Sequence, residues 1–102
     1  MQINFSPTSM FKRLAVSKAG DALTINDVAY DFGELADGDT LPRDAVDCEW
    51  LASDVTRIGG VIHLTLTLPH GSGAPYKTRF PEPITVTEDG PIALPPYDEV
   101  TS

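Results

Sequence analysis

The sequence predicts an all-β fold, a small antiparallel sandwich or open barrel that is built from sequential hairpins. Three observations predict this class: short runs rich in β-branched residues, alternation of apolar and polar residues within those runs, and turn residues at about every tenth position. The chain has 102 residues, a length that suits one domain with a single core. We therefore expect a single β domain over residues 1–102, in which residues 95–102 form a C-terminal tail.

The clearest element is a hairpin over residues 55–68. Two runs rich in β-branched residues meet at Gly59-Gly60, a dipeptide that tolerates the positive φ angles of tight primed turns. Pairing Ile58 with Val61 predicts one buried face and one wet face for this hairpin. The buried face would carry Val55, Ile62, Leu64, Leu66 and Leu68, and the wet face Thr56, His63, Thr65 and Thr67.

Two short strands are expected near the N-terminus. The first covers residues 2–5 and ends at Ser6-Pro7, because proline interrupts a hydrogen-bonded ladder. The second covers residues 13–17, and residues 18–21 form the turn after it.

A second hairpin is predicted over residues 22–32, with Asn26-Asp27 as its turn. Pairing Ile25 with Val28 places Leu23 opposite Tyr30. One face would carry Leu23, Ile25, Val28, Tyr30 and Phe32, and the other Ala22, Thr24, Ala29 and Asp31. A slip of one residue would mix these faces, so the pattern selects the register.

The middle of the chain is expected to be irregular. Residues 33–48 lack period-two alternation and read as a loop, with at most one helical turn near residues 42–46. Thr40 would lie near the start of that turn, and a proline such as Pro42 suits the first helical position. Residues 49–52 are expected to resume an extended conformation.

The C-terminal third is rich in proline, which favours edge strands and rigid crossings. Residues 69–75 should break the preceding strand, because nothing in that stretch suits a central strand. Residues 76–80 suggest a short edge strand. A last hairpin is predicted from residues 84–87 and 92–94, with its turn at residues 88–91.

The charge distribution is uneven. The formal net charge is −8, and residues 21–54 hold ten carboxylates against one base, Arg43, a local charge of −9. Nucleic acid is therefore a disfavoured partner, since phosphate contacts need clustered lysine and arginine. Two interpretations stay open: the acids maintain solubility, or they form an acidic face for a basic partner. The candidate partner-binding residues are Asp37, Asp39, Asp44, Asp47, Glu49, Trp50 and Tyr97.

No combination of residues predicts catalysis, a metal or a cofactor. His63 and His70 fall on opposite faces of an extended chain, and Ser72 lies between two glycines without a rigid frame. The acids around Gly38 do not match the spacing of a helix-loop-helix calcium site. The lone Cys48 cannot form an intrachain disulfide, which fits a reducing, cytosolic compartment. The N-terminus lacks the layout of a signal peptide, and no apolar run approaches the ~20 residues that span a bilayer.

The order of several short motifs carries a resemblance that spans almost the whole chain. These motifs are residues 3–7, 23–26, 31–32, 40–42, 64–71, 79–84 and 89–95. Together they resemble a group of proteins of roughly this length, without an established activity, that are encoded in tail gene clusters of tailed bacteriophages and prophages.

This resemblance implies a non-enzymatic accessory or structural protein of tail assembly. Its partners would be other tail proteins or further copies of itself, and it would lie in the bacterial cytoplasm during assembly or in the virion tail. The alternative is a small β module that binds a sugar or a peptide, which would need an exposed pocket formed by Trp50 and tyrosines.

Overall fold

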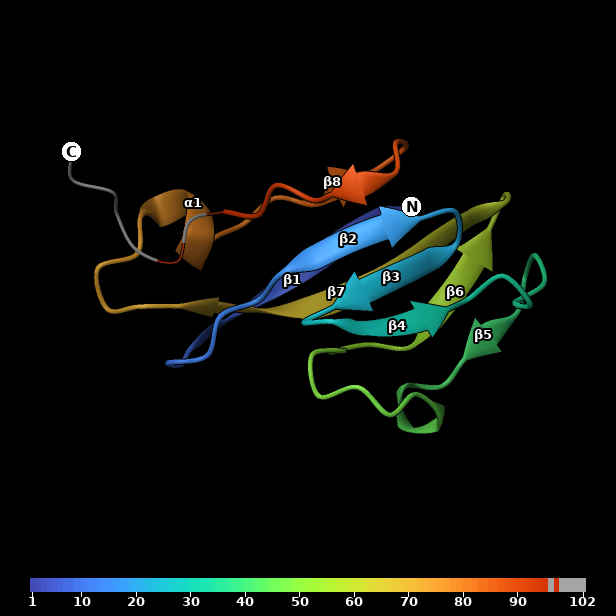
Figure 1. The fold of residues 1–102 in the computed structure, drawn as a ribbon, viewed down its shortest axis with the longest axis horizontal. Helices are drawn as coiled ribbons and strands as arrows, with labels where there is room; N and C mark the ends of the chain where they lie inside the picture. Colours follow the sequence, from blue (N-terminus) through green and yellow to red (C-terminus); the bar gives the residue numbers. More distant parts are fainter. Residues whose placement is uncertain (96, 98–102) are drawn as a thin grey trace.

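The computed structural model describes residues 1–95 and 97, and in these residues two β-sheets pack face to face (Figure 1). The five-stranded sheet has the order β5 (Thr40–Leu41), β6 (Val55–Ile58), β7 (Val61–His70), β1 (Gln2–Ser9), β8 (Ile84–Thr85). The four-stranded sheet has the order β4 (Val28–Asp31), β3 (Ala22–Ile25), β2 (Val16–Ala19), β9 (Gly90–Pro91). The predicted all-β class is confirmed, and the described strands close no barrel.

Both predicted two-residue hairpins are confirmed with their registers. Ile25 pairs with Val28 and Ile58 pairs with Val61. The first turn has φ angles of 47° at Asn26 and 70° at Asp27, and the second has 58° and 80° at its two glycines. Positive φ at both central positions is the geometry of the primed turns that match strand twist, so local turn chemistry explains both hairpins.

Burial follows the predicted faces with two exceptions, the exposed Val28 and the half-buried Tyr30. Every residue assigned to the buried face of the 55–68 hairpin is buried, and its threonines and His63 are half-buried. In the other hairpin Leu23, Ile25 and Phe32 are buried, whereas Val28 is 51% exposed. Val28 adjoins the turn on the edge strand β4, where the opposite sheet does not cover it.

The longest strand pair in the molecule is parallel, which the sequence did not predict. β1 runs parallel to β7 over their whole shared length, from the pair Gln2–His63 to the pair Ser9–His70. β1 therefore continues past residue 5, through Pro7, and β7 continues through Pro69. Each proline lies where its strand has only one neighbouring strand, so the missing N–H removes no ladder hydrogen bond there.

Two expectations for the C-terminal third are wrong. Residues 76–79 form the short helix α1 (Tyr76–Arg79) rather than an edge strand, and Tyr76 stacks on Phe80 one turn later with ring centroids 4.7 Å apart. The predicted last hairpin does not form either. β8 pairs with β1 and β9 pairs with β2, so this segment crosses from one sheet to the other.

The middle of the chain holds the expected helical turn, a 3₁₀ helix, η1 (Arg43–Ala45). Pro42 precedes that turn in an extended conformation. The loop prediction missed β5, which pairs with β6. Residues 49–52 make only one isolated bridge, between Leu51 and Leu66.

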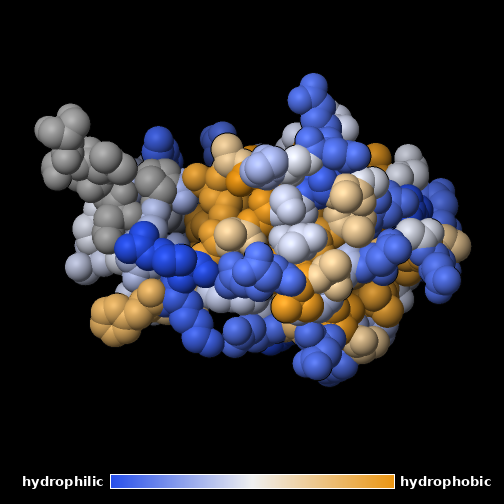
Figure 2. Space-filling view, in the orientation of Figure 1, coloured by the Kyte–Doolittle hydropathy of each residue, from blue (hydrophilic) through white to orange (hydrophobic). Residues whose placement is uncertain are grey.

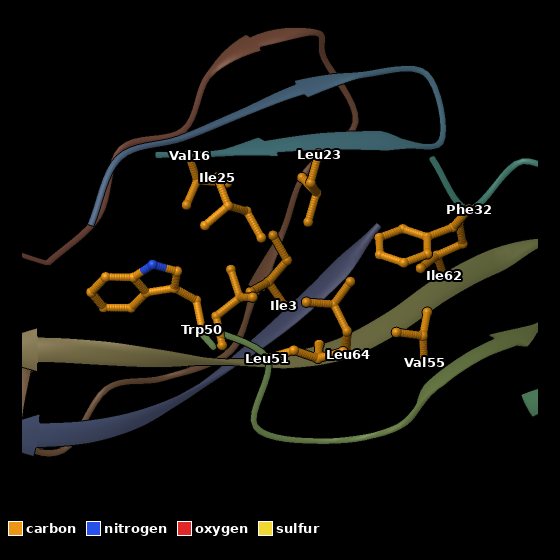
Figure 3. Close-up of a cluster of buried hydrophobic side chains, with 11 residues drawn as sticks. Ile3, Val16, Leu23, Ile25, Phe32, Trp50, Leu51, Val55, Ile62 and Leu64 are labelled. Carbon is orange, nitrogen blue, oxygen red and sulfur yellow. The ribbon is translucent and has the colours of Figure 1, made fainter. Parts of the chain in front are cut away.

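The core lies between the two sheets (Figure 3). Side chains of the four-stranded sheet, such as Leu23 and Ile25, point toward Ile3 and Leu64 of the five-stranded sheet. Phe32 lies at one end of this row and Trp50 at the other. Trp50 is only 5% exposed, so the segment that leads into β6 is anchored in the core.

Candidate interaction surface

The acidic residues Asp44, Asp47 and Glu49 lie exposed on one loop that follows β5. This loop surrounds a shallow hollow of about 470 Å³ that is lined by residues 43, 44 and 46–49. Its start is fixed because the Arg43 N–H donates to an Asp54 carboxylate oxygen at 2.8 Å. Its end is fixed by buried Trp50. The three carboxylates are therefore presented on a backbone that is held at both ends.

Tyr30 attaches the middle of this loop to strand β4. Its hydroxyl donates to the backbone carbonyl of Asp47 at 3.2 Å. A hydrogen bond with the Cys48 side chain, burial, and the negative charges of Asp47 and Glu49 together raise the pKa of Tyr30 to about 12. The phenol stays neutral at physiological pH, so it donates its proton to the loop throughout that range.

Asp37 and Asp39 belong to a different structural unit. One Asp37 carboxylate oxygen accepts the Gly60 N–H at 2.9 Å and so fixes the β6–β7 turn. The Asp39 carbonyl accepts the Arg57 N–H at 3.2 Å, and the Gly38 N–H donates to the Arg57 carbonyl at 2.7 Å. These two acids therefore support the end of β6, and the predicted acidic set divides into two groups.

The two aromatic candidates have different positions. Trp50 is buried, so its indole is not available to a partner at the surface. The Tyr97 ring lies under the Arg13 guanidinium, 3.5 Å from its centroid, and the Tyr97 hydroxyl donates to the Met10 carbonyl. The ligand-binding alternative required an exposed Trp50 pocket, and the structure places that residue in the core.

The connection between β1 and β2 brings Tyr97 and Glu49 to one end of the molecule. Lys12 forms an ion pair with Glu49 at 3.2 Å, and the adjacent Arg13 contacts Tyr97. A hollow of about 300 Å³ lies beside them, lined by Arg13, Leu14, Leu68, Leu94 and Tyr97 among others. Phe11 in the same connection is 97% exposed. No sequence signal predicts this exposed phenylalanine, because its neighbours show no periodic pattern.

Strand β4 forms one edge of the four-stranded sheet. Because Val28 pairs with Ile25 directly across the turn, the N–H and C=O groups of Ala29 and Asp31 point away from β3. Both residues are exposed, and Asp27 in the turn is exposed as well. This edge offers backbone hydrogen-bonding groups to an added strand, in an acidic setting.

The remaining sequence motifs do not gather into a site. Within residues 1–95 and 97, no group of three histidine, cysteine, aspartate or glutamate side chains is placed to hold a metal ion. His63 and His70 lie seven positions apart on one strand, β7. No helix in the described part of the chain is long and apolar enough to cross a membrane.

Comparison of the chain with protein families, with curated proteins and with solved structures gives no match.

Proposed function

We propose that the protein is a non-enzymatic accessory or structural component of a bacteriophage or prophage tail, and that it acts through protein–protein contacts. The order of short motifs along the chain supports this proposal, because it resembles proteins encoded in tail gene clusters. Two features of the surface support a contact role: the acidic loop and the edge of β4.

The acidic loop is the observation that carries the proposal. Asp44, Asp47 and Glu49 are exposed on a segment that the Tyr30 and Asp54 side chains and buried Trp50 hold in place. A fixed loop loses little conformational entropy when it docks, and its charge attracts a basic surface. Charge complementarity of this kind speeds association and selects partners.

The edge of β4 supports the same role in a second way. Tyr30 lies on β4 and hydrogen-bonds the acidic loop, so the edge and the loop adjoin. A basic extended segment of a partner would pair with the Ala29 and Asp31 backbone groups while its side chains meet the carboxylates. The partner would then be a tail protein with a basic extended arm or edge strand.

A pull-down from the lysate of an induced lysogen tests this function. Tagged protein should retain tail proteins, identified by mass spectrometry, and raised salt should release them because exposed charges are screened. A variant carrying D44N, D47N and E49Q should retain much less. The matched control carries E34Q, E82Q and E88Q, three exposed acids outside both the acidic loop and the β4 edge, and should behave as the wild type.

The outcome that would contradict the proposal is equally specific. Equal retention by both variants would exclude the acidic loop as the contact. Retention of no tail protein by the wild type would remove the tail assignment itself.

A further inference from the structure

The outer face of the five-stranded sheet carries no charged side chain. Arg57 is the only charged residue in its five strands, and all five lie within the described residues. The Arg57 guanidinium is on the inner side, where it donates to the Leu35 and Phe32 carbonyls and to Asp21. The chain has a net charge of −8, so this face contrasts with the acidic loop.

The register places uncharged polar side chains in one row across this face. Neighbouring strands pair residues Thr40 with Thr56, Thr56 with His63, His63 with Gln2, and Gln2 with Thr85. Two further pairs continue the pattern along β7 and β1, namely Thr65 with Asn4 and Thr67 with Ser6. All of these residues are half-buried or exposed.

An apolar pair adjoins that row. Ile58 and Val61 lie opposite each other at the tip of the β6–β7 hairpin, and alternation along each strand puts them on the outer face with Thr56 and His63. Ile58 is 61% exposed and Val61 is 38% exposed. The outer face thus combines hydroxyl and amide groups with exposed aliphatic area.

We propose that this face binds the same face of a second copy of the chain, with two-fold symmetry. Threonine, serine, asparagine and glutamine each both donate and accept hydrogen bonds, so a surface made of them is complementary to itself. A two-fold interface requires such self-complementarity. The proposal deepens the proposed function, since it names one partner and the surface that receives it.

Electrostatics favour a second copy on this face over the parts of the surface that carry the acids. Two copies with the same strong negative charge repel one another wherever their acids approach, and burying unpaired charge is costly. Figure 2 shows the opposite side of the molecule, where hydrophilic side chains surround patches of hydrophobic and weakly polar residues. The uncharged face lets two copies meet without desolvating a carboxylate.

The area of the outer face determines how strongly two copies should bind. Strand spacing and rise give it a flat area of roughly 500 Å², somewhat less than the ~800 Å² that each partner contributes to a standard interface. An interface of this size corresponds to a weak, reversible dimer. The dimer should therefore form only as the protein concentration is raised.

Sedimentation velocity over a wide concentration range tests the proposal. The wild type, with a mass of 11.0 kDa, should shift toward twice that mass as concentration rises. Thr65→Glu places a carboxylate near the centre of the face and should weaken the dimer by at least about tenfold. The matched control is Thr24→Glu, because Thr24 is an equally half-buried strand residue on the outer face of the other sheet. This control should leave the dimer unchanged.

A second variant protects the test against misfolding. Ile58→Thr keeps a β-branched side chain in the strand, removes apolar area from the face, and should also weaken the dimer. Circular dichroism and thermal unfolding identify any variant that fails to fold. A wild type that stays monomeric at the highest concentration, or equal effects of T65E and T24E, would overturn the proposal.

Two results separate this inference from the proposed function. Tail proteins that are captured by a monomeric chain would leave the function standing without the dimer. A dimer that captures no tail protein would leave this inference standing without the proposed function. Capture of a different protein that T65E abolishes and T24E does not would assign this face to that protein instead of a second copy.

Discussion

The Arg57 guanidinium donates to the Asp21 carboxylate at 3.1 Å and thereby joins β6 of one sheet to the β2–β3 turn of the other. The same guanidinium also donates to the carbonyls of Leu35, Phe32 and Gly60. One side chain, 13% exposed, therefore connects several segments at the end of the sandwich, and loops there need no regular structure to be fixed.

Replacing this side chain should show how much it contributes. Arg57→Met leaves several carbonyls without their donor, so we expect the free energy of unfolding to fall by about 2–4 kcal/mol. Asp21→Asn removes only the half-exposed partner charge, and should cost no more than about 1 kcal/mol. Urea unfolding measures both. Equal losses would mean that the ion pair, rather than the carbonyl contacts, carries the effect.

Turn conformation gives a second prediction. Gly60 has a φ of 80°, and no atom lies within 4 Å of the position where a Cβ would be added. The cost of Gly60→Ala should thus be purely conformational, about 1–2 kcal/mol. Gly73→Ala is the control, because Gly73 is not among the residues with positive φ. Thermal unfolding compares the two, and a neutral Gly60→Ala would contradict the primed turn.

Tyr30 should be detectable by its late ionisation. The chain has three tyrosines, and a spectrophotometric titration should show one of them ionising near pH 12, the raised pKa of Tyr30. Tyr30→Phe should remove that component, and Cys48→Ala should move it toward the ordinary value because the interaction with Cys48, the largest cause of the raised pKa, is lost. A rapid pH jump allows the ionisation to be recorded before the protein unfolds at alkaline pH.

The same residue makes stability depend on alkaline pH. The folded state holds the phenol proton more tightly than the unfolded state, so its contribution is complete below the ordinary tyrosine pKa of ~10. The contribution is lost as the pH rises from there toward the folded value of about 12. Tyr30→Phe should therefore lose less stability than the wild type over this window.

Asp89 makes the stability of the protein depend on pH in the acidic range. Its carboxylate accepts the Gly20 N–H at 2.9 Å and the Lys18 ammonium at 3.1 Å, and these contacts hold its pKa below the usual range. The stabilisation is present above the unfolded pKa of ~3.9 and disappears as the pH falls through the lower folded value. The difference in thermal unfolding midpoint between the wild type and Asp89→Asn should therefore shrink as the pH falls through this range. Glu88→Gln, an exposed neighbour, should show no such change.

The sequence predicts the parts of this fold that local chemistry decides. The two-residue turns at Asn26-Asp27 and Gly59-Gly60 bring adjacent segments together, and alternation then selects the register. The buried and wet faces of the β6–β7 hairpin follow from the same rule. Fold class and both hairpins are therefore available without any knowledge of the rest of the chain.

Other features depend on distant partners and have no local signal. The parallel pairing of β1 with β7 joins segments about 60 positions apart, and nothing within residues 2–9 indicates it. Residues 76–80 suggested an edge strand, yet the spacing of four between Tyr76 and Phe80 suits stacking along a helix. The contact surface shows the same division: exposure of Asp44 was predicted, whereas burial of Trp50 depends on how the sheets pack.

The parallel β1–β7 pair also determines when the protein can fold during synthesis. β1 leaves the ribosome before its neighbour β7, which begins about 50 residues further along the chain. Until then the apolar side chains of β1, including Ile3, have no sheet to cover them. β9, which completes the other sheet, follows later still. The sandwich therefore cannot assemble until β7 and β9 have been made, and the many carboxylates of the nascent chain help to keep it dispersed until its first strand is paired.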